Sequence, residues 1–534
     1  MIVIRGAEVY NPARGHAPQP GDLWIEDGRI IRPRRDVIPE QVIDARGMII
    51  APAGIEIHTH VTGYPLSLAR RFTLSEGCQE NPLLPSPAEA ARLYLQLGYT
   101  TVFDAATSPL YAFSSYSDLR QMEGVDRGTF ILAGDHHLLL QALASNDMAY
   151  AHDIIAWLVS CSGGYALKLV NPGGGFAWKN HRKAPDLDEG IGIGTLTQRD
   201  VLKRCVQAVN QLGMPHPVHI HAGQLGQPGN AVNFCNSIRA LESQRAHLCH
   251  IQFFSYGLDP SGGYRSGAEE VVRTLEEFPQ LTCDVGQIMF GGAMTVTADT
   301  SALSRLQQGL KKPWISNQVE AEGGNNILPL KYAPKDPSNA VQWATGLELL
   351  LLSPDPARMF LTTDHPNGGP FETYPELIEL LMSRESRLEA IQQVHRAAAD
   401  KTGLAAIERE YSLGEIFAMT SFGPARSLGL NDRGHLEPGA LADIRCYKKQ
   451  ADIRKMFASP EWVMKNGRVV YQNGRVNPQG IGEILVSRPP YDEGQLLHIK
   501  SDLENKISVP FDQYALGGTG MENTREVPCT STGS

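Results

Sequence analysis

Long apolar runs are missing from this sequence. No stretch approaches the roughly 18 consecutive apolar residues that a membrane-spanning helix requires. The opening segment MIVIRGAEVY also lacks the charged head and the extended apolar core of a secretory signal peptide. We therefore expect a cytoplasmic protein with no segment inside a membrane.

An excess of positive charge is missing as well. Lys and Arg number 48 against 58 Asp and Glu, so the formal net charge is −10 at pH 7. A protein that holds nucleic acid or an anionic membrane by bulk charge needs the opposite balance. The sequence therefore predicts no nucleic-acid partner and favours small molecules or other proteins as partners.

Closely spaced cysteine pairs are also absent. The eight cysteines contain no C-x-x-C motif and are too widely spaced to form the dense disulfide framework of a small secreted domain. They stand at positions 78, 161, 205, 235, 249, 283, 446 and 529. We expect buried, reduced thiols at these positions, and neither a thiolate zinc site nor an iron–sulfur cluster.

The middle of the chain contains short apolar runs separated by helical stretches, which is typical of repeated βα units. Eight such runs lie at 54–61, 99–105, 128–134, 165–170, 216–222, 246–253, 281–287 and 358–364. This number and spacing predict an α/β protein whose strands close into a (β/α)₈ barrel. The long interval before the last run predicts an insertion, which opens with IMFGGAMTVTADTS and follows the catalytic end of a strand.

Both ends of the chain contain short β-rich runs and turns in place of the βα pattern of the middle. Short β-rich runs and turns occupy residues 1–50, and similar runs, ADIRCY, WVMKNGRVVYQNGRV and EILVSRP, begin within residues 421–485. Asn466-Gly467 and Asn473-Gly474 stand where hairpin turns are expected. We expect these two parts to form one small composite β-sandwich domain, with the barrel at 51–420 and an extension and tail at 486–534.

Histidines stand in pairs on two of the predicted barrel strands. His58 and His60 are two residues apart on the first strand, and His219 and His221 repeat this spacing on the fifth. Because side chains alternate along a strand, the members of each pair share a face. Two imidazoles at the mouth of a barrel can hold one metal ion.

Two further strands end in ligand-type side chains. On the sixth strand, His247 and His250 are three residues apart and should face opposite ways, so we expect only His250 to point inward. Asp364 ends the eighth strand, where a carboxylate can serve as metal ligand and proton carrier. We expect a structural role for the following His365.

Lys168 lies within the apolar run YALKLV, where an unpaired ammonium is costly to bury. A salt bridge is one explanation. The other is that its neutral amine captures carbon dioxide and becomes a carbamate that bridges two metal ions. The histidine pairs on the first and fifth strands favour the carbamate.

Together these residues resemble the amidohydrolase superfamily of metal-dependent hydrolases. The flanking segments VIDARGMIIAPAGIEIHTH and SFGPARSLGLNDRGHLEPGALADI also resemble its domain edges, although Ala53-Gly54 replaces the Pro-Gly of many members. The resemblance implies two Zn²⁺ ions bound by His58, His60, carboxylated Lys168, His221, His250 and Asp364. His219 is the alternative to His221, and Asp364 would also be the catalytic proton carrier.

A narrower resemblance is to the A subunits of formylmethanofuran dehydrogenase and of the bacterial formyltransferase/hydrolase complex. It is carried by LKLVNPGG, HPVHIHAGQLGQPGN, HIQFFSYG, DVGQIMFGG and TTDHPNGGPF. It implies reversible hydrolysis of an N-formyl aminomethylfuran coenzyme, formylmethanofuran or methylofuran, to formate and free amine in one-carbon metabolism. It also implies partner subunits, among them a formyltransferase.

Substrate-binding residues are predicted near the barrel mouth. The loop NPGGGFAWKNHRKAP follows Lys168 and carries cations that suit an acidic coenzyme tail. The candidates are Tyr64, Asn171, Gln287, Lys179, Arg182 and Lys183.

Two other functions remain open. A cyclic-amide hydrolase of the dihydroorotase or hydantoinase type would share the fold and the metals but not the LVNPGG and HPNGGPF surroundings. A non-catalytic assembly subunit would keep the fold, although such proteins usually lose several ligands. The Gly-rich GIGIG at 190–194 lacks the strand and helix of a phosphate-binding loop.

Overall fold

The computed structural model describes residues 1–34, 37–73, 83–181, 184–311, 315–317, 322–477, 480–507, 509–514, 516 and 523–530. Parallel strands at its centre pair in the order β8-β9-β10-β11-β12-β13-β16-β20. They are β8 (Gly54–Thr59), β9 (Tyr99–Thr107), β10 (Asp126–Leu132), β11 (Ala166–Val170), β12 (His219–His221), β13 (His247–Leu248), β16 (Thr282–Asp284) and β20 (Met359–Phe360). Each lies within one of the predicted runs or overlaps it, so the predicted α/β barrel is confirmed.

The barrel is curled rather than regularly closed between its first and last strands. The His60 N–H donates to the His365 carbonyl oxygen at 2.7 Å, and the Thr362 hydroxyl donates to the His58 carbonyl oxygen at 2.9 Å. These contacts bring the ends of β8 and β20 together, and with them the ligand-type residues of both.

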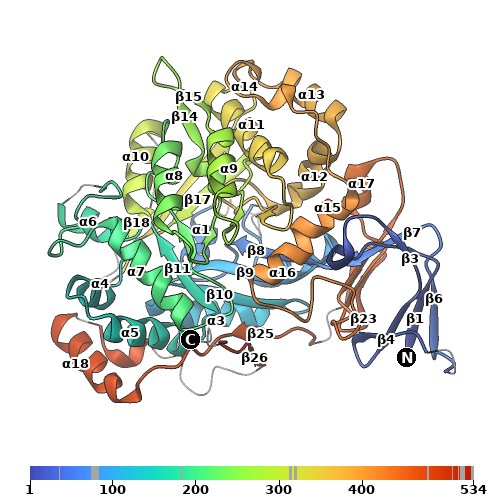
Figure 1. Cartoon of the computed structure of the whole chain (residues 1–534), viewed down its shortest axis with the longest axis horizontal. Coiled ribbons are helices and arrows are strands. Elements are labelled where there is room, and N and C mark those ends of the chain that lie inside the picture. Colours follow the sequence, from blue (N-terminus) through green and yellow to red (C-terminus); the bar gives the residue numbers. More distant parts are fainter. Residues whose placement is uncertain are drawn as a thin grey trace.

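Helices cover the outer face of this sheet (Figure 1). They are α2 (Pro87–Gln96), α3 (Ala112–Gln121), α4 (His137–Ala144), α5 (Met148–Cys161), α7 (Gln198–Gln211), α8 (Ala231–Ala240), α9 (Ala268–Glu276), α11 (Pro337–Leu352) and α12 (Tyr374–Met382). Local sequence sets their starts: Thr197 and Asp200 form a capping box on α7, and Asp336 caps α11. Shorter helices are α6 (Gly174–His181), α13 (Arg384–Gln393), α14 (Ala397–Asp400), α15 (Leu413–Phe417), α16 (Gly423–Ser427) and α17 (Ile453–Ala458).

The predicted insertion forms a small antiparallel sheet of its own. It consists of β17 (Gly291–Thr297), α10 (Thr300–Leu310), β18 (Ile315–Asn317) and β19 (Asn325–Tyr332), with β19 between the other two strands. Its buried Val296 and Ile327 pack on Leu66 and Ala69 of α1 (Tyr64–Thr73). This layer covers the end of the barrel where the ligand-type residues lie.

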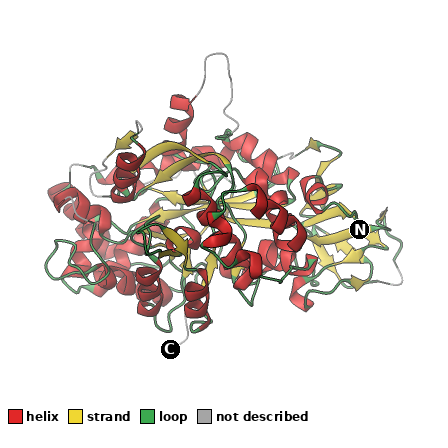
Figure 2. Cartoon of the chain, turned by 90° about the horizontal axis from the view of Figure 1, so that it is seen from above, coloured by secondary structure: helices red, strands yellow, loops and turns green. Residues whose placement is uncertain are grey.

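Strands from both chain ends share one sheet, as the sequence predicted. β7 (Met48–Pro52) pairs antiparallel with β21 (Ile444–Lys448), which continues into β22 (Trp462–Lys465) and β23 (Arg468–Gln472). A second sheet has the order β5-β4-β1-β6, with bounds Arg29–Ile31, Leu23–Glu26, Ile2–Arg5 and Gln41–Asp44. Asn466 and Gly467 both adopt positive φ at the β22–β23 turn. These strands form one end of the molecule (Figures 1 and 2).

The segment EILVSRP departs from the prediction. Its strand β25 (Ile484–Val486) does not join the small β domain but pairs parallel with β10 at the base of the barrel (Figure 1). β26 (Thr524–Glu526) pairs with β25, beyond the helix α18 (Leu496–Lys506). All three residues of β25 are buried, and such an uninterrupted apolar run suits an interior strand better than a half-exposed one.

A buried charge cluster ties the barrel to the small β domain. Lys465 Nζ of β22 lies 2.6 Å from both Asp126 Oδ2 of β10 and Asp443 Oδ2, and Arg433 pairs with the same Asp126 carboxylate. Lys465 is fully buried, and Asp126 and Arg433 are almost so. Each charge is compensated, as low-dielectric surroundings require.

Candidate metal centre

His58 and His60 lie at the end of β8 beside the carboxylate of Asp364. His58 Nε2 is 3.1 Å and His60 Nε2 is 3.0 Å from Asp364 Oδ1. The other nitrogen of His58, Nδ1, is 3.1 Å from Asp284 Oδ2. His58, His60 and Asp364 offer ligand atoms that all lie within 4.8 Å of one another. The predicted first and eighth strands therefore do bring these three residues together.

The two histidines of β12 lie at different depths in the barrel. His221 lines a cavity of about 70 Å³, together with His60, Lys168, His250 and Asp364. His219 lies deeper, with Nε2 3.0 Å from His58 Nδ1 and its ring against Phe130. Of the two alternatives, His221 is the one that faces the cavity.

Both histidines of β13 point into the barrel, contrary to expectation. His247 Nε2 contacts Asp284 Oδ2 at 3.0 Å, while His250 lines the cavity. The reason is the backbone of His250, whose φ of 38° breaks the alternation of the strand. Gly286 permits this, because a Cβ there would lie 2.4 Å from His250 Cβ.

Positive φ recurs at residues that follow barrel strands. Asn171 (φ 43°) follows β11 and Asp364 (φ 49°) follows β20, as His250 follows β13. Non-glycine residues hold this conformation only where their surroundings enforce it, and such positions cluster at functional sites. The turns thus aim His250 and Asp364 toward the cavity, while Asn171 contacts Gln198.

Asp284, at the end of β16, is a site residue that sequence reasoning missed. Its fully buried carboxylate contacts His58 Nδ1 and His247 Nε2 and accepts the His250 N–H at 2.6 Å. Asp284 ends the observed β16 but stood in the middle of the predicted seventh run at 281–287, so its place at a strand end was not visible from the sequence. Asp299 was missed too, and its Oδ2 lies 3.8 Å from His221 Nε2.

Lys168 does not have the salt bridge that would explain its burial most simply. Among the described residues, no carboxylate lies within ion-pair distance of its ammonium, which donates instead to Cys249 Sγ at 2.9 Å. Lys168 is 1% exposed and lines the cavity. An ammonium with only a thiol partner in this position keeps the carbamate explanation open.

The electrostatics of the cluster favour a bound cation. Burial lowers the pKa values of His221 and His250, so both imidazoles are neutral, the form that binds metals. Burial raises the pKa of Asp364, but His58 and His250 outweigh it and the net shift is strongly downward. For His58, burial and Lys168 lower the pKa, yet Asp284 and Asp364 raise it overall. Positive charge is thus stabilised between these two carboxylates.

The donor set fits a metal such as zinc. Imidazole nitrogens and carboxylate oxygens are its common ligands. His221 Nε2 and His250 Nδ1 are buried and have no hydrogen-bond partner, although buried polar atoms are normally satisfied. A metal ion that binds this cluster would satisfy these two ring nitrogens of His221 and His250.

The predicted substrate-binding residues do not line this cavity. Asn171 is bonded to Gln198, Gln287 to the Ile288 and Trp343 carbonyl oxygens, and Lys179 to the Glu322 carbonyl oxygen. Tyr64 stacks on Tyr111, with ring centroids 4.8 Å apart. Arg182 and Lys183 lie outside the described residues. The walls come instead from Leu66, Leu225, Phe253, Thr295, Val296, Asn325, Tyr332 and Asn367.

The sequence profile of the family described as "Amidohydrolase family" matches residues 41–471, which span the cluster and the barrel. The chain belongs to this family. Within the described residues, no helix has the length and apolarity needed to cross a membrane.

Two amidohydrolase relatives match over nearly the whole chain. The A subunit of the formyltransferase/hydrolase complex Fhc of Methylorubrum extorquens is 35% identical over 98% of this chain and 97% of its own length. "Protein FwdA" of Methanocaldococcus jannaschii is 31% identical over 99% of both chains.

A solved structure agrees with these matches. A chain from the crystal structure of the formyltransferase/hydrolase complex FhcABCD of Methylorubrum extorquens, in complex with methylofuran, has a TM-score of 0.94. It is 34% identical, and the match covers 99% of this chain and 100% of that one. The similarity therefore includes the barrel, the insertion and the small β domain.

Proposed function

We propose that this protein is a zinc-dependent amidohydrolase that hydrolyses the linear N-formyl amide of an aminomethylfuran coenzyme, formylmethanofuran or methylofuran, to formate and free amine. The observation that carries the proposal is a cavity that ends on His60, Lys168, His221, His250 and Asp364, in a chain similar over its whole length to the A subunit of Fhc. The reaction is reversible, and its direction depends on concentrations.

Partner subunits are part of this proposal. The structurally similar chain belongs to a complex with four kinds of subunit, FhcABCD. We propose that the present chain also works inside such a complex, with a formyltransferase as one partner, in the cytoplasm.

Two zinc ions would be held by His58, His60, His221, His250, Asp364 and the carbamate of Lys168. When bound, they supply a polarised formyl oxygen and a hydroxide at neutral pH. Asp364 is placed to move the proton. Its Oδ1 accepts from Asn367 Nδ2 at 3.0 Å, and its backbone N–H donates to the Thr362 hydroxyl at 3.0 Å, so the carboxylate is fixed at the cavity wall. It would take the nucleophile's proton and deliver it to the departing amine nitrogen.

The cavity walls select the substrate and exclude water. Leu66, Leu225, Phe253 and Val296 present apolar surface around the polar end. Such a wall favours a flat apolar group next to the amide, because burying it releases water from both surfaces. A furan ring has this character.

The decisive experiment combines metal analysis with a formate-release assay, using the protein with its accompanying subunits and an N-formyl aminomethylfuran. We expect about two zinc ions per chain and formate release. Asp364→Asn should abolish release while most metal stays bound, whereas Asp188→Asn, in an exposed pair with Arg199, should change neither. Turnover of cyclic amides alone would indicate the hydantoinase type, and absence of both metal and turnover would indicate an assembly subunit.

A further inference from the structure

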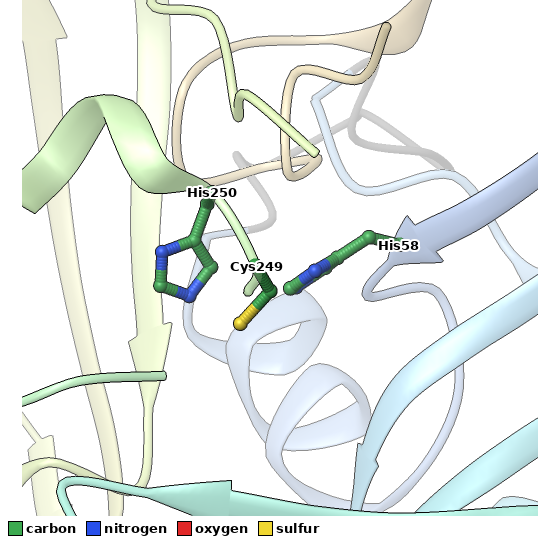
Figure 3. A group of neighbouring side chains, drawn as sticks. All are labelled: His58, Cys249 and His250. Atoms are coloured by element: carbon green, nitrogen blue, oxygen red, sulfur yellow. The ribbon is translucent and has the colours of Figure 1, made fainter. Parts of the chain in front are cut away.

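Cys249 lies inside the ligand cluster. It follows β13 directly, is fully buried, and has its sulfur 2.9 Å from Lys168 Nζ. Its sulfur and the ligand atoms of His58 and His250 all lie within 4.8 Å of one another. Figure 3 shows His58 reaching from β8 toward Cys249 and His250, which come from a different part of the barrel wall.

The other described cysteines have no such surroundings. Cys205 is buried in the apolar core, and Cys283 contacts the Arg358 carbonyl oxygen and Met359 Sδ. Among the described residues, each group of potential ligands that contains a cysteine contains Cys249. The same alternation that turns His247 inward places Cys249 on the inner face, with Leu248 between them pointing away.

A second observation indicates that a ligand is missing. His250 Nδ1 is buried and makes no hydrogen bond, and buried His58 Nε2 lies 3.1 Å from Asp364 Oδ1 in a contact that lacks hydrogen-bond geometry. Leaving such atoms unpaired costs about 1–3 kcal/mol each, so a bound group normally satisfies them. The thiol itself makes only weak contacts, to Lys168 and to the Ile220 carbonyl oxygen at 3.1 Å.

We propose that Cys249 is a ligand of the metal centre and that its sulfur binds the ion held by His58 and His250. This inference rests on the proposed metal-dependent function. The thiol gives up its proton to solvent when the sulfur–metal bond forms, and no redox step is involved. A soft thiolate favours zinc over hard ions such as magnesium or manganese, which carboxylates alone would not exclude.

Lys168 touches the same sulfur, and its role is therefore linked to that of Cys249. An ammonium at Lys168 donates a hydrogen bond to the thiolate, which offsets the negative charge in this buried position. A carbamate at Lys168 would instead add a second anionic ligand beside it. In both states the sulfur stays bound to the metal.

X-ray absorption of the zinc-loaded complex tests the proposal without any activity measurement. A zinc–sulfur shell at about 2.3 Å is expected beside nitrogen and oxygen ligands at about 2.0–2.1 Å. Cobalt substitution gives a second readout, because a bound thiolate produces a sulfur-to-cobalt charge-transfer band. Cys249→Ser should lose both signals, while Cys283→Ser should keep both and Lys168→Ala should keep the sulfur shell.

The outcomes separate this inference from the proposed function. Bound metal with formate release, but with nitrogen and oxygen ligands only, would overturn the role of Cys249 and leave the hydrolase intact. Absence of bound metal would overturn both. If Cys249→Ser does not fold, the wild-type spectrum alone still decides, because a zinc–sulfur shell is either present or absent.

Discussion

The carboxylate of Asp284 organises three groups of the candidate metal centre. Its Oδ2 lies 3.1 Å from His58 Nδ1 and 3.0 Å from His247 Nε2, and its Oδ1 accepts the His250 N–H at 2.6 Å. Asp284→Asn keeps the shape but replaces one oxygen by an NH₂ group. In one orientation of the amide this group faces the His250 N–H, and in the other it faces His58 Nδ1 and His247 Nε2, which keep their contacts only if both rings present an unprotonated nitrogen.

The size of the effect follows from these contacts. A buried donor that loses its acceptor should lower the free energy of unfolding by about 1–3 kcal/mol. His58 also loses the anionic partner that orients its ring and raises its basicity. Removal of such a partner typically weakens metal binding by about 10- to 100-fold, or about 1.4 to 2.7 kcal/mol.

Competition with a chelator measures the metal affinity, and urea unfolding of the metal-free protein measures the stability. Asp336→Asn is the matched control, because Asn caps α11 as well as Asp does. We expect weaker metal binding and lower stability in Asp284→Asn alone. Wild-type values for both quantities would refute the positioning role of Asp284.

Three further predictions concern other parts of the molecule. Asp126→Ala leaves buried Arg433 and Lys465 without their shared partner and should cost about 3–5 kcal/mol in urea unfolding, while Asp44→Ala in an exposed pair should cost nothing measurable. Burial raises the pKa of Glu348 to about 7 from 4.5, so the folded protein keeps a proton that the unfolded chain loses. The free energy of unfolding should therefore fall by up to about 3 kcal/mol as the pH rises from about 4.5 to about 7. Glu348→Gln should remove this part of the pH dependence of stability. An unchanged pH dependence in the variant would contradict the raised pKa of Glu348. Lys168→Ala should lower bound zinc from about two ions per chain if a carbamate bridges them, and short carboxylic acids should partly restore it; an unchanged zinc content would argue against the carbamate.

The barrel could be predicted from sequence because each of its strands is a short apolar run that ends in polar residues. This pattern of apolar runs can be recognised in the sequence without knowledge of the tertiary structure. EILVSRP shows its limit: a fully buried apolar run fits any interior position, and pairing with β10 rather than β23 depends on which neighbour covers it. The hairpin turn at Asn466-Gly467 was readable, since both residues tolerate the positive φ that the turn needs.

For the site, the sequence by itself determined which strands carry ligand-type side chains: His58 and His60, Lys168, the pair His219 and His221, and Asp364 follow from strand periodicity and from their place at strand ends. Tertiary structure decided the rest. Positive φ at His250 turned its side chain inward as well as that of His247, and the depth of each residue in the barrel set His221 at the cavity and His219 below it. Asp284 reaches His247 and His250 because β13 and β16 lie side by side, and Cys249 meets Lys168 and His58 because the curled barrel brings their strands together. Contacts between strands depend on sheet order and register, which periodicity within one strand does not encode.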